Sequence, residues 1–324
     1  MLKRRDFILA GGAAALATPS IAATPWPNKP VRVVVAFNSG GGIDIMTRLA
    51  CQVLTNRLGV PFVVENRPGA SGNIGTAQVA RAEPDGYTLC SISIGNLTFN
   101  QQMFTNLGYD PVNDFSHVAG LWELPNFLIV PTAHVPATNM AEFLAWARSR
   151  PAGTINFATP GSGSTVNLTG ATFAKKAGFD ATSVSASDAQ AMQLLLRGDI
   201  HYVTNQLPPF ADLIRDGRLR VLAVADRQRW AAMPDVPTME EAGVPDLSVS
   251  SWHMLGGPRG LPQEIVQRLN AELRAGLLTD EFRSRVAILG ARVLVSSPQE
   301  VEARLARERP IWAEMVRLSG ARAE

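Results

Sequence analysis

The chain contains the stretch Val31-Arg32-Val33-Val34-Val35-Ala36-Phe37-Asn38-Ser39-Gly40-Gly41-Gly42-Ile43-Asp44. Its first half is a nearly continuous apolar run rich in β-branched residues, which is typical of a strand buried in a parallel sheet. The glycines end the strand. From Asp44 onward, apolar residues recur at helical spacing, at Met46, Leu49, Ala50, Val53 and Leu54. This strand–turn–helix unit favours an α/β fold.

The alternation of strand and helix continues in two series along the chain. The first series adds strands at 61–65 and 87–92, with a short helix that ends near Arg81. The second has helices at 139–150, 165–177 and 188–197. Its strands are expected at 155–158, 182–184, 200–204 and 220–225. Two layers of similar size therefore follow one another in the sequence.

Two extended segments, 117–130 and 252–255, connect these layers, and helices at 262–277, 280–289 and 299–317 close the chain. A tail made mostly of helices cannot form its own layer, so we expect it to pack back on the first one. The sequence therefore predicts two doubly wound α/β lobes joined by two crossing strands, with a ligand cleft between them. Residues 24–127 and 250–324 would form the first lobe, and 128–249 the second.

Residues 1–23 differ from the rest of the chain. A basic start (Lys3, Arg4, Arg5) precedes an apolar run at 7–16 and small residues at 20–23, which is the layout of a signal peptide. The sequence around Arg4 and Arg5 resembles a twin-arginine export signal. The alternative is an N-terminal membrane anchor, but the apolar run is short and rich in Ala and Gly.

The charge balance argues against nucleic acid as a partner. The chain has 30 basic and 28 acidic residues, and residues 1–23 hold three and one of these, so 27 of each remain after cleavage. The four histidines show no metal spacing, and we expect no metal and no cofactor. Cys51 and Cys90 fall in a predicted helix and a predicted strand. They are expected to be separate buried thiols, although an oxidising compartment would also allow a pair.

Three glycine-rich loops follow predicted strands, where ligands bind in open α/β sheets. Their candidate binding residues are Asn38, Ser39, Gly40, Gly41, Gly42, Ile43 and Asp44; Ser93, Gly95 and Asn96; and Thr159, Gly161, Ser162, Gly163, Ser164 and Thr165. Backbone N–H groups, hydroxyls and helix N-termini bind anions, and none of the loops contains Lys or Arg. The hypothesis is a cleft for a small organic acid. Each loop alone could equally be a turn and cap, and Asp44 could either stabilise the helix dipole or accept a hydrogen bond from the ligand.

Enzyme motifs are lacking. The glycines form neither a dinucleotide fingerprint nor a Walker loop, and Ser71 lacks the spacing of a nucleophile elbow. We therefore expect no catalytic residues. One rival remains, a secreted hydrolase that would pair Ser162 or Ser164 with His201 or His253 across the cleft.

Ordered motifs extend from about residue 26 to the end of the chain. They are PNKPVRVVV at 27–35, GGGID at 40–44, VVENRPGASGNIG at 63–75, PDGYTL at 84–89, YDP with DF at 109–115, and PDVPT with EAG at 234–243. The chain resembles the Bug family, the substrate-binding proteins of tripartite tricarboxylate transporters. The resemblance implies a periplasmic location and a type II periplasmic-binding-protein fold. It also implies carboxylate capture through amides, hydroxyls and waters, with Asp44 contacting the ligand in some members.

Family members deliver ligand to membrane permease subunits, or act as orphan receptors whose partner would be a sensor kinase ectodomain. We expect a monomer. Three departures from the family pattern fall on the expected cleft. Asn38–Ser39 replaces two prolines, Ser185–Ala186–Ser187 replaces Tyr–Lys–Gly, and Asn205–Gln206 replaces Asp–Asn. Ser187, Asp188, Asn205 and Gln206 complete the expected ligand-binding residues, and these changes leave the ligand's identity open.

Overall fold

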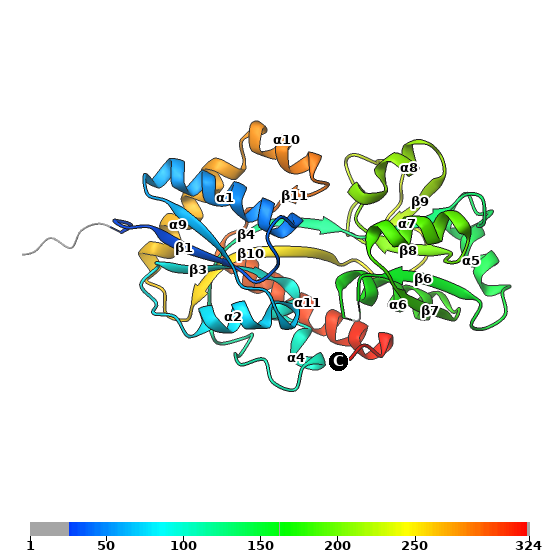
Figure 1. The fold of residues 1–324 in the computed structure, drawn as a ribbon, viewed down its shortest axis with the longest axis horizontal. Coiled ribbons are helices and arrows are strands. Elements are labelled where there is room, and N and C mark those ends of the chain that lie inside the picture. The colour runs from blue at the N-terminus through cyan, green and yellow to red at the C-terminus, as the bar shows by residue number, and fades with distance from the viewer. Residues whose placement is uncertain (1–25, 162, 323–324) are drawn as a thin grey trace, which may run out of the picture.

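Two β-sheets, one in each lobe, form the frame of the molecule (Figure 1). The computed structural model describes residues 26–161 and 163–322. The predicted signal peptide at 1–23 and the candidate residue Ser162 lie outside them. We call the lobe with the six-stranded sheet lobe 1 and the lobe with the five-stranded sheet lobe 2.

The sheet of lobe 1 has the order β11-β4-β10-β3-β1-β2. Its strands are β1 (Val31–Val35), β2 (Phe62–Asn66), β3 (Thr88–Ser93), β4 (Phe115–Pro125), β10 (Ser250–Pro258) and β11 (Arg292–Val293). The interior strand β1 pairs in parallel with β2 and β3, and Val31, Val33, Val34 and Val35 are fully buried. The apolar run that opens the chain's first motif is therefore a core strand, as predicted.

The sheet of lobe 2 has the order β7-β6-β8-β5-β9. Its strands are β5 (Phe127–Pro131), β6 (Ile155–Thr159), β7 (Ala181–Ser185), β8 (Tyr202–Asn205) and β9 (Leu219–Val224). The order β7-β6-β8 repeats the order β2-β1-β3 of lobe 1, and in each sheet an antiparallel strand comes next. That strand is β10 in lobe 1 and β5 in lobe 2, so each lobe receives a strand as the chain crosses between the lobes.

Helices cover both sheets (Figure 1). In lobe 1 they include α1 (Gly42–Leu58), α2 (Asn73–Ala80), α9 (Gln263–Leu277) and α10 (Asp280–Ile288), and in lobe 2 α5 (Met140–Arg148), α6 (Thr165–Ala177) and α7 (Asp188–Arg197). The predicted two-lobed α/β architecture is confirmed. Cys51 and Cys90 are separate buried thiols, as expected.

Short helical turns were not predicted from the sequence. They are α3 (Ile94–Leu97), α4 (Asn100–Met103), α8 (Ala211–Arg215) and the 3-10 turns Ala70–Gly72 and Pro208–Phe210. The expected loop at Ser93–Asn96 begins α3, because the Ser93 side chain accepts a hydrogen bond from the Asn96 N–H. Segments of three to five residues are too short to show a helical repeat, which explains why the pattern did not reveal them.

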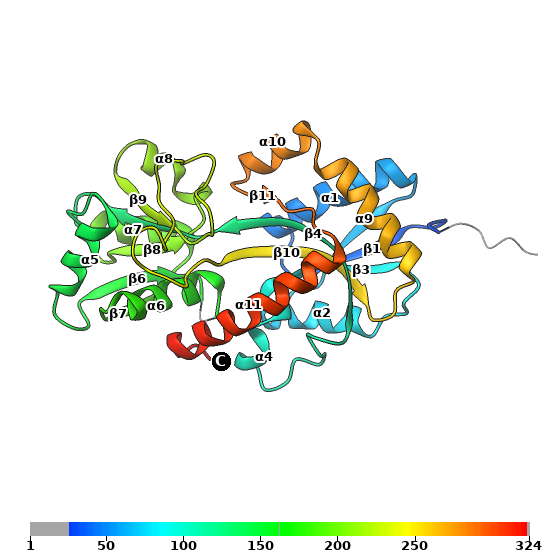
Figure 2. The same ribbon diagram turned by 180° about the vertical axis from the view of Figure 1, so that it is seen from behind.

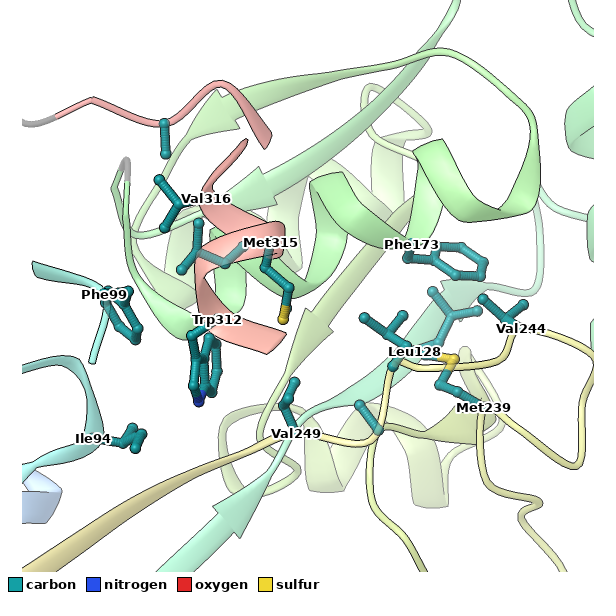
Figure 3. Packing of buried hydrophobic residues seen from close by; sticks show 14 of the residues in the cluster. Ile94, Phe99, Leu128, Phe173, Met239, Val244, Val249, Trp312, Met315 and Val316 are labelled. Atoms are coloured by element: carbon teal, nitrogen blue, oxygen red, sulfur yellow. The ribbon is translucent and has the colours of Figure 1, made fainter. Parts of the chain in front are cut away.

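The last helix, α11 (Pro298–Ser319), corrects the expectation that the tail packs on the first lobe alone. It contacts β4 and α4 of lobe 1 and α6 of lobe 2, and Figure 2 shows it running diagonally across the junction. Its fully buried Trp312 lies 5.0 Å from Phe99, ring to ring. Met315 packs in the same cluster as Phe173 of lobe 2 (Figure 3). A 22-residue helix is about 33 Å long, enough to extend from one lobe to the other.

A buried cluster of charges fixes the place where the chain crosses between the lobes. We call Glu123, Asp226, Arg292, Arg304 and Glu308 the hinge cluster. Glu123 on β4 is only 4% exposed and forms ion pairs with Arg292 on β11 and, at 2.8 Å, with Arg304 on α11. Arg292 also reaches Asp226 of lobe 2 at 2.9 Å, and Arg304 reaches Glu308 at 2.7 Å. The cluster thus connects both lobes to the crossing strand.

Burial raises the pKa of Glu123, but the charges of Arg304 and Arg292 outweigh it and hold the pKa below its usual value. A carboxyl group with a lowered pKa contributes stability above its unfolded pKa and loses that contribution as the pH falls through its folded value. Glu123 therefore stabilises the fold at neutral pH and does so less in acid, whereas burial raises the pKa of Asp226, which works in the opposite direction.

We predict that Glu123→Gln lowers the free energy of unfolding by about 3 kcal/mol at pH 7, because two partly buried guanidinium groups lose their counter-charge. The difference from the unchanged protein should shrink as the pH falls below 4.5, the ordinary pKa of Glu. Urea unfolding at several pH values measures both effects. The matched control is Glu241→Gln, which removes an exposed ion pair with Arg229 and should have a much smaller effect. If both variants lost the same free energy of unfolding, the stabilising role assigned to Glu123 would be contradicted.

Candidate functional site

A cavity of about 590 Å³ lies between the two lobes. It is bounded by segments that follow the carboxyl ends of β1, β3, β6, β7 and β8 and by the crossing strand β10. This is the position where open α/β sheets bind ligands, and the volume is that of a small-molecule site.

The cavity brings together eleven of the twenty residues expected from the sequence. They are Ile43, Ser93, Gly95, Gly161, Gly163, Ser164, Thr165, Ser187, Asp188, Asn205 and Gln206. Eight others do not line it, namely Asn38, Ser39, Gly40, Gly41, Gly42, Asp44, Asn96 and Thr159. Nine further lining residues were not among those expected. They are Phe37, Ser71, Ile94, Phe99, Asn100, Pro160, Val166, Ser251 and His253.

The first glycine loop is folded around the chain's own carboxylate. Asp44 is 2% exposed and accepts hydrogen bonds from the Gly40 N–H at 2.9 Å, Arg48 Nε at 3.0 Å and Asn66 Nδ2 at 2.9 Å. Burial alone would raise the pKa of Asp44, but these hydrogen bonds outweigh it and lower the pKa to about 2. The carboxylate of Asp44 therefore occupies the anion position that the sequence suggested for a ligand.

The second loop supports the cavity wall from behind. Asn96 is 1% exposed, and its Nδ2 donates to the Ser71 carbonyl at 3.2 Å and to Asn73 Oδ1 at 3.1 Å. Ser93 Oγ donates to Asn96 Oδ1 at 2.6 Å. Ser93 and Gly95 consequently face the cavity, whereas Asn96 holds the turn at Ser71 against the end of β3.

The third loop leads into α6 and places a helix N-terminus at the cavity. Ser164 caps the helix, with its Oγ accepting from the Asn167 N–H at 3.1 Å and donating to the Gly161 carbonyl at 3.0 Å. Thr165 and Val166, which both line the cavity, begin the helix, where N–H groups have no partner within the helix. The start of α6 therefore lies at the space between the lobes.

Three helices of eight or more residues begin beside this cavity, and among these only α6 has no acidic residue in its first turn. The four-residue helices α3 and α4 also begin there without an acidic residue, but they are too short to have a large helix dipole. Asp44 lies in the first turn of α1 and Asp188 in that of α7. An acidic side chain there interacts favourably with the positive end of the helix dipole. The N-terminus of α6 is therefore the end of the cavity best able to bind an added anion.

The model of the tripartite tricarboxylate transporter family receptor matches residues 46–317. The chain belongs to this family. The resemblance to the Bug proteins is also confirmed, since BugT of Bordetella pertussis is 30% identical over 311 residues, covering 95% of this chain and 94% of BugT.

Solved structures of related receptors have the same fold. Rpa4515 of R. palustris, solved with adipate, has a TM-score of 0.77 and 33% identity, covering 92% of this chain and 99% of that one. MatC of Rhodopseudomonas palustris, solved with bound malate, has a TM-score of 0.73 and 32% identity over 90% of this chain and all of MatC. The type II two-lobed fold expected from the sequence is thus confirmed.

In this family member, the lobe 2 wall contains a pair of polar side chains that hold each other. Asn205 Nδ2 donates to Asp188 Oδ1 at 2.8 Å, and the Gln206 N–H donates to Asn205 Oδ1 at 2.8 Å. Ser187 and Gln190 form a capping box that fixes the start of α7 next to them. The departures from the family pattern at Ser187 and at Asn205–Gln206 therefore lie on the cavity surface.

The crossing strand β10 contributes His253, which sequence reasoning considered only for the rival hydrolase. Its ring lies in the cavity wall between Phe37, at a centroid distance of 6.1 Å, and Trp122, at 5.6 Å. Burial lowers the pKa of His253 to about 3, so the imidazole is neutral at physiological pH. A lone histidine in a strand has no spacing signal. Its place in a predicted crossing strand was the one feature that could have indicated it.

Two further observations concern only the residues that the structure describes. Residues 26–161 and 163–322 include no helix that is both long and apolar enough to cross a membrane. Over the same residues, no group of three His, Cys, Asp or Glu side chains could hold a metal ion.

We predict that Asp44→Asn lowers the free energy of unfolding by about 2 kcal/mol at pH 7, as the lowered pKa of Asp44 implies. Because this carboxyl contributes stability only while ionised, the difference should shrink as the pH falls from 4 toward 2. Urea unfolding across this range measures the change. Asp212→Asn, at an exposed ion pair with Arg215, is the control and should show little effect at any pH. A loss for Asp44→Asn that does not vary with pH would refute the ionic role.

Proposed function

We propose that this chain is a periplasmic solute-binding receptor that captures a small organic acid between its lobes and delivers it to the permease of a tripartite tricarboxylate-type transporter. The observation that carries the proposal is the N-terminus of α6, which opens into the interlobe cavity and has no acidic residue of its own. The adipate and malate with which two related receptors were solved support a carboxylate as the ligand class. The export signal at 1–23 supports the location.

The carboxylate would accept hydrogen bonds from the N–H groups of Thr165 and Val166 and from the Thr165 hydroxyl. Among the described residues that line the cavity, none is Lys or Arg. Held by amides and hydroxyls rather than by an ion pair, the ligand could leave when a permease opens the lobes. We propose a monomer without metal or cofactor, with lobe 1 at 24–127 and 250–324 and lobe 2 at 128–249.

Lobe closure would occur around the crossing strands. The lobes already meet beside the cavity, where Gly163 of lobe 2 approaches Met103 of lobe 1 so closely that a Cβ on Gly163 would lie 1.8 Å from Met103 Cε. On the side of α10, Gly290 lies against Pro208 of lobe 2, whose Cγ would be 2.4 Å from an added Cβ. A Cβ at Gly290 would clash with the rigid ring of Pro208, whereas a Cβ at Gly163 would displace the flexible end of Met103. These contacts would guide the closing movement.

The rival functions have less support. Of the residues considered for a hydrolase, Ser164 Oγ is engaged in the helix cap and His201 accepts a hydrogen bond from the Asn156 N–H. Ser162 lies outside the described residues, and His253 is packed between Phe37 and Trp122. A receptor for a sensor kinase ectodomain would use the same ligand cleft. No observation on the cavity favours that partner over a permease.

We predict that the purified mature protein is stabilised against heat by at least one acid in a panel of small carboxylates.

Gly163→Ala should raise the Kd for that acid at least tenfold, because the added Cβ displaces Met103 beside the anion-binding helix. The matched control is Gly217→Ala, which has a similar positive φ of 71° but open surroundings and lies in a turn of lobe 2. Its Kd should stay within about twofold. Calorimetric titration tests this, and a panel without any binding acid would refute the proposal.

A further inference from the structure

The cavity has two walls of different chemistry. The lobe 2 wall offers hydroxyls, amides and the start of α6, whereas the facing wall contains an apolar and aromatic patch of Phe37, Ile94, Phe99 and His253. Beside this patch, the facing wall also has polar residues, Ser71, Ser93, Asn100 and Ser251. Ile94, Phe99 and His253 are each at most 4% exposed. An apolar and aromatic surface of this kind favours the hydrocarbon part of a ligand rather than a second charged group.

Within this patch, His253 is the residue that carries polar side-chain atoms. It is 2% exposed, and its Nδ1 is buried without a hydrogen-bond partner. A buried polar atom without a partner is uncommon and costly in native proteins. The ring is held by Phe37 at an interplanar angle of 71° and is stacked on Trp122 at 19°. These aromatic contacts fix its orientation against the cavity.

The ionisable residues around the cavity also disfavour a second charged group on the ligand. Besides His253, the ionisable side chain among its described lining residues is Asp188, a carboxylate. A ligand with two carboxylates could place one at the start of α6. Its second would then meet the apolar patch, neutral hydroxyl and amide groups and a neutral imidazole, and no cation from these residues.

We infer that the ligand has a single carboxylate and an apolar body that carries one neutral polar group, such as an amide or a hydroxyl, which hydrogen-bonds to His253. In this arrangement His253 determines specificity by distinguishing ligands with a neutral polar end from ligands with a charged end. The inference rests on the proposed function, because it assumes that the carboxylate binds at α6. It also separates this chain from the relatives solved with adipate and malate.

The test uses matched triples of linear acids with chains of four to eight carbons. Each triple contains the dicarboxylate, its monoamide, and the monocarboxylate of the same length. We expect the monoamide to bind about tenfold more tightly than the dicarboxylate at the best-fitting length, by calorimetric titration. This order is measured on the unchanged protein and does not depend on any variant folding.

His253→Phe keeps an aromatic ring between Phe37 and Trp122 but removes the ring nitrogens. It should raise the Kd of the monoamide about tenfold and leave that of the monocarboxylate within about twofold. His253→Gln, which retains a neutral hydrogen-bonding group, should preserve part of the preference. The control His201→Phe lies outside the cavity and should change no Kd more than twofold. Melting curves confirm that each variant is folded.

Two results would overturn the inference while carboxylate capture stands. One is a dicarboxylate that binds more tightly than the monoamide at every length. The other is that His253→Phe raises the Kd of all three acids of a triple equally. Binding of some other acid from the wider panel, with none of the triples bound, would also overturn it. If no acid of the panel binds, the proposed function is refuted, and the inference is refuted with it.

Discussion

The ion pairs of Glu123 with Arg292 and Arg304 are the interaction on which the arrangement of the two lobes depends. They lie where β4 leaves lobe 1, and Arg292 carries the connection on to Asp226 of lobe 2. The crossing strands β10 and β5 each complete the sheet of the lobe that they enter. The ion pairs at the crossing therefore determine how the carboxyl ends of the two sheets face each other. They also determine the positions of the loops that bound the cavity.

Much of this fold could be predicted from the sequence because its strands are buried runs and its helices show clear periodicity. The run at Val31–Val35 identified a buried interior strand of lobe 1, and α7 was predicted with its observed bounds, Asp188–Arg197. The lobe-spanning position of α11 could not be predicted, because its apolar residues show that one face is buried but not which lobe covers it. The hinge cluster joins residues as far apart as Glu123 and Arg292, and no local pattern connects such positions.

The candidate site was predicted in part, for a physical reason that differs from loop to loop. At the start of α6 the local rules for caps and helix starts are sufficient, and Gly161, Gly163, Ser164 and Thr165 do line the cavity. At Asn38–Asp44 the same rules suggest an anion site, but the anion is Asp44 itself, recruited together with Arg48 and the distant Asn66. His253 gains its place only through the pairing of β10 with β3 and β4. The spacing of residues in the sequence does not indicate that His253 lies in the cavity wall.

A crystal structure with the tightest-binding acid of the panel would test the central claim most directly, because it locates the carboxylate. The account predicts that the carboxylate oxygens lie about 3 Å from the N–H groups of Thr165 and Val166, with the body of the ligand against Phe37 and His253. A carboxylate bound at Asn38–Gly42, or a ligand outside the interlobe cavity, would contradict it.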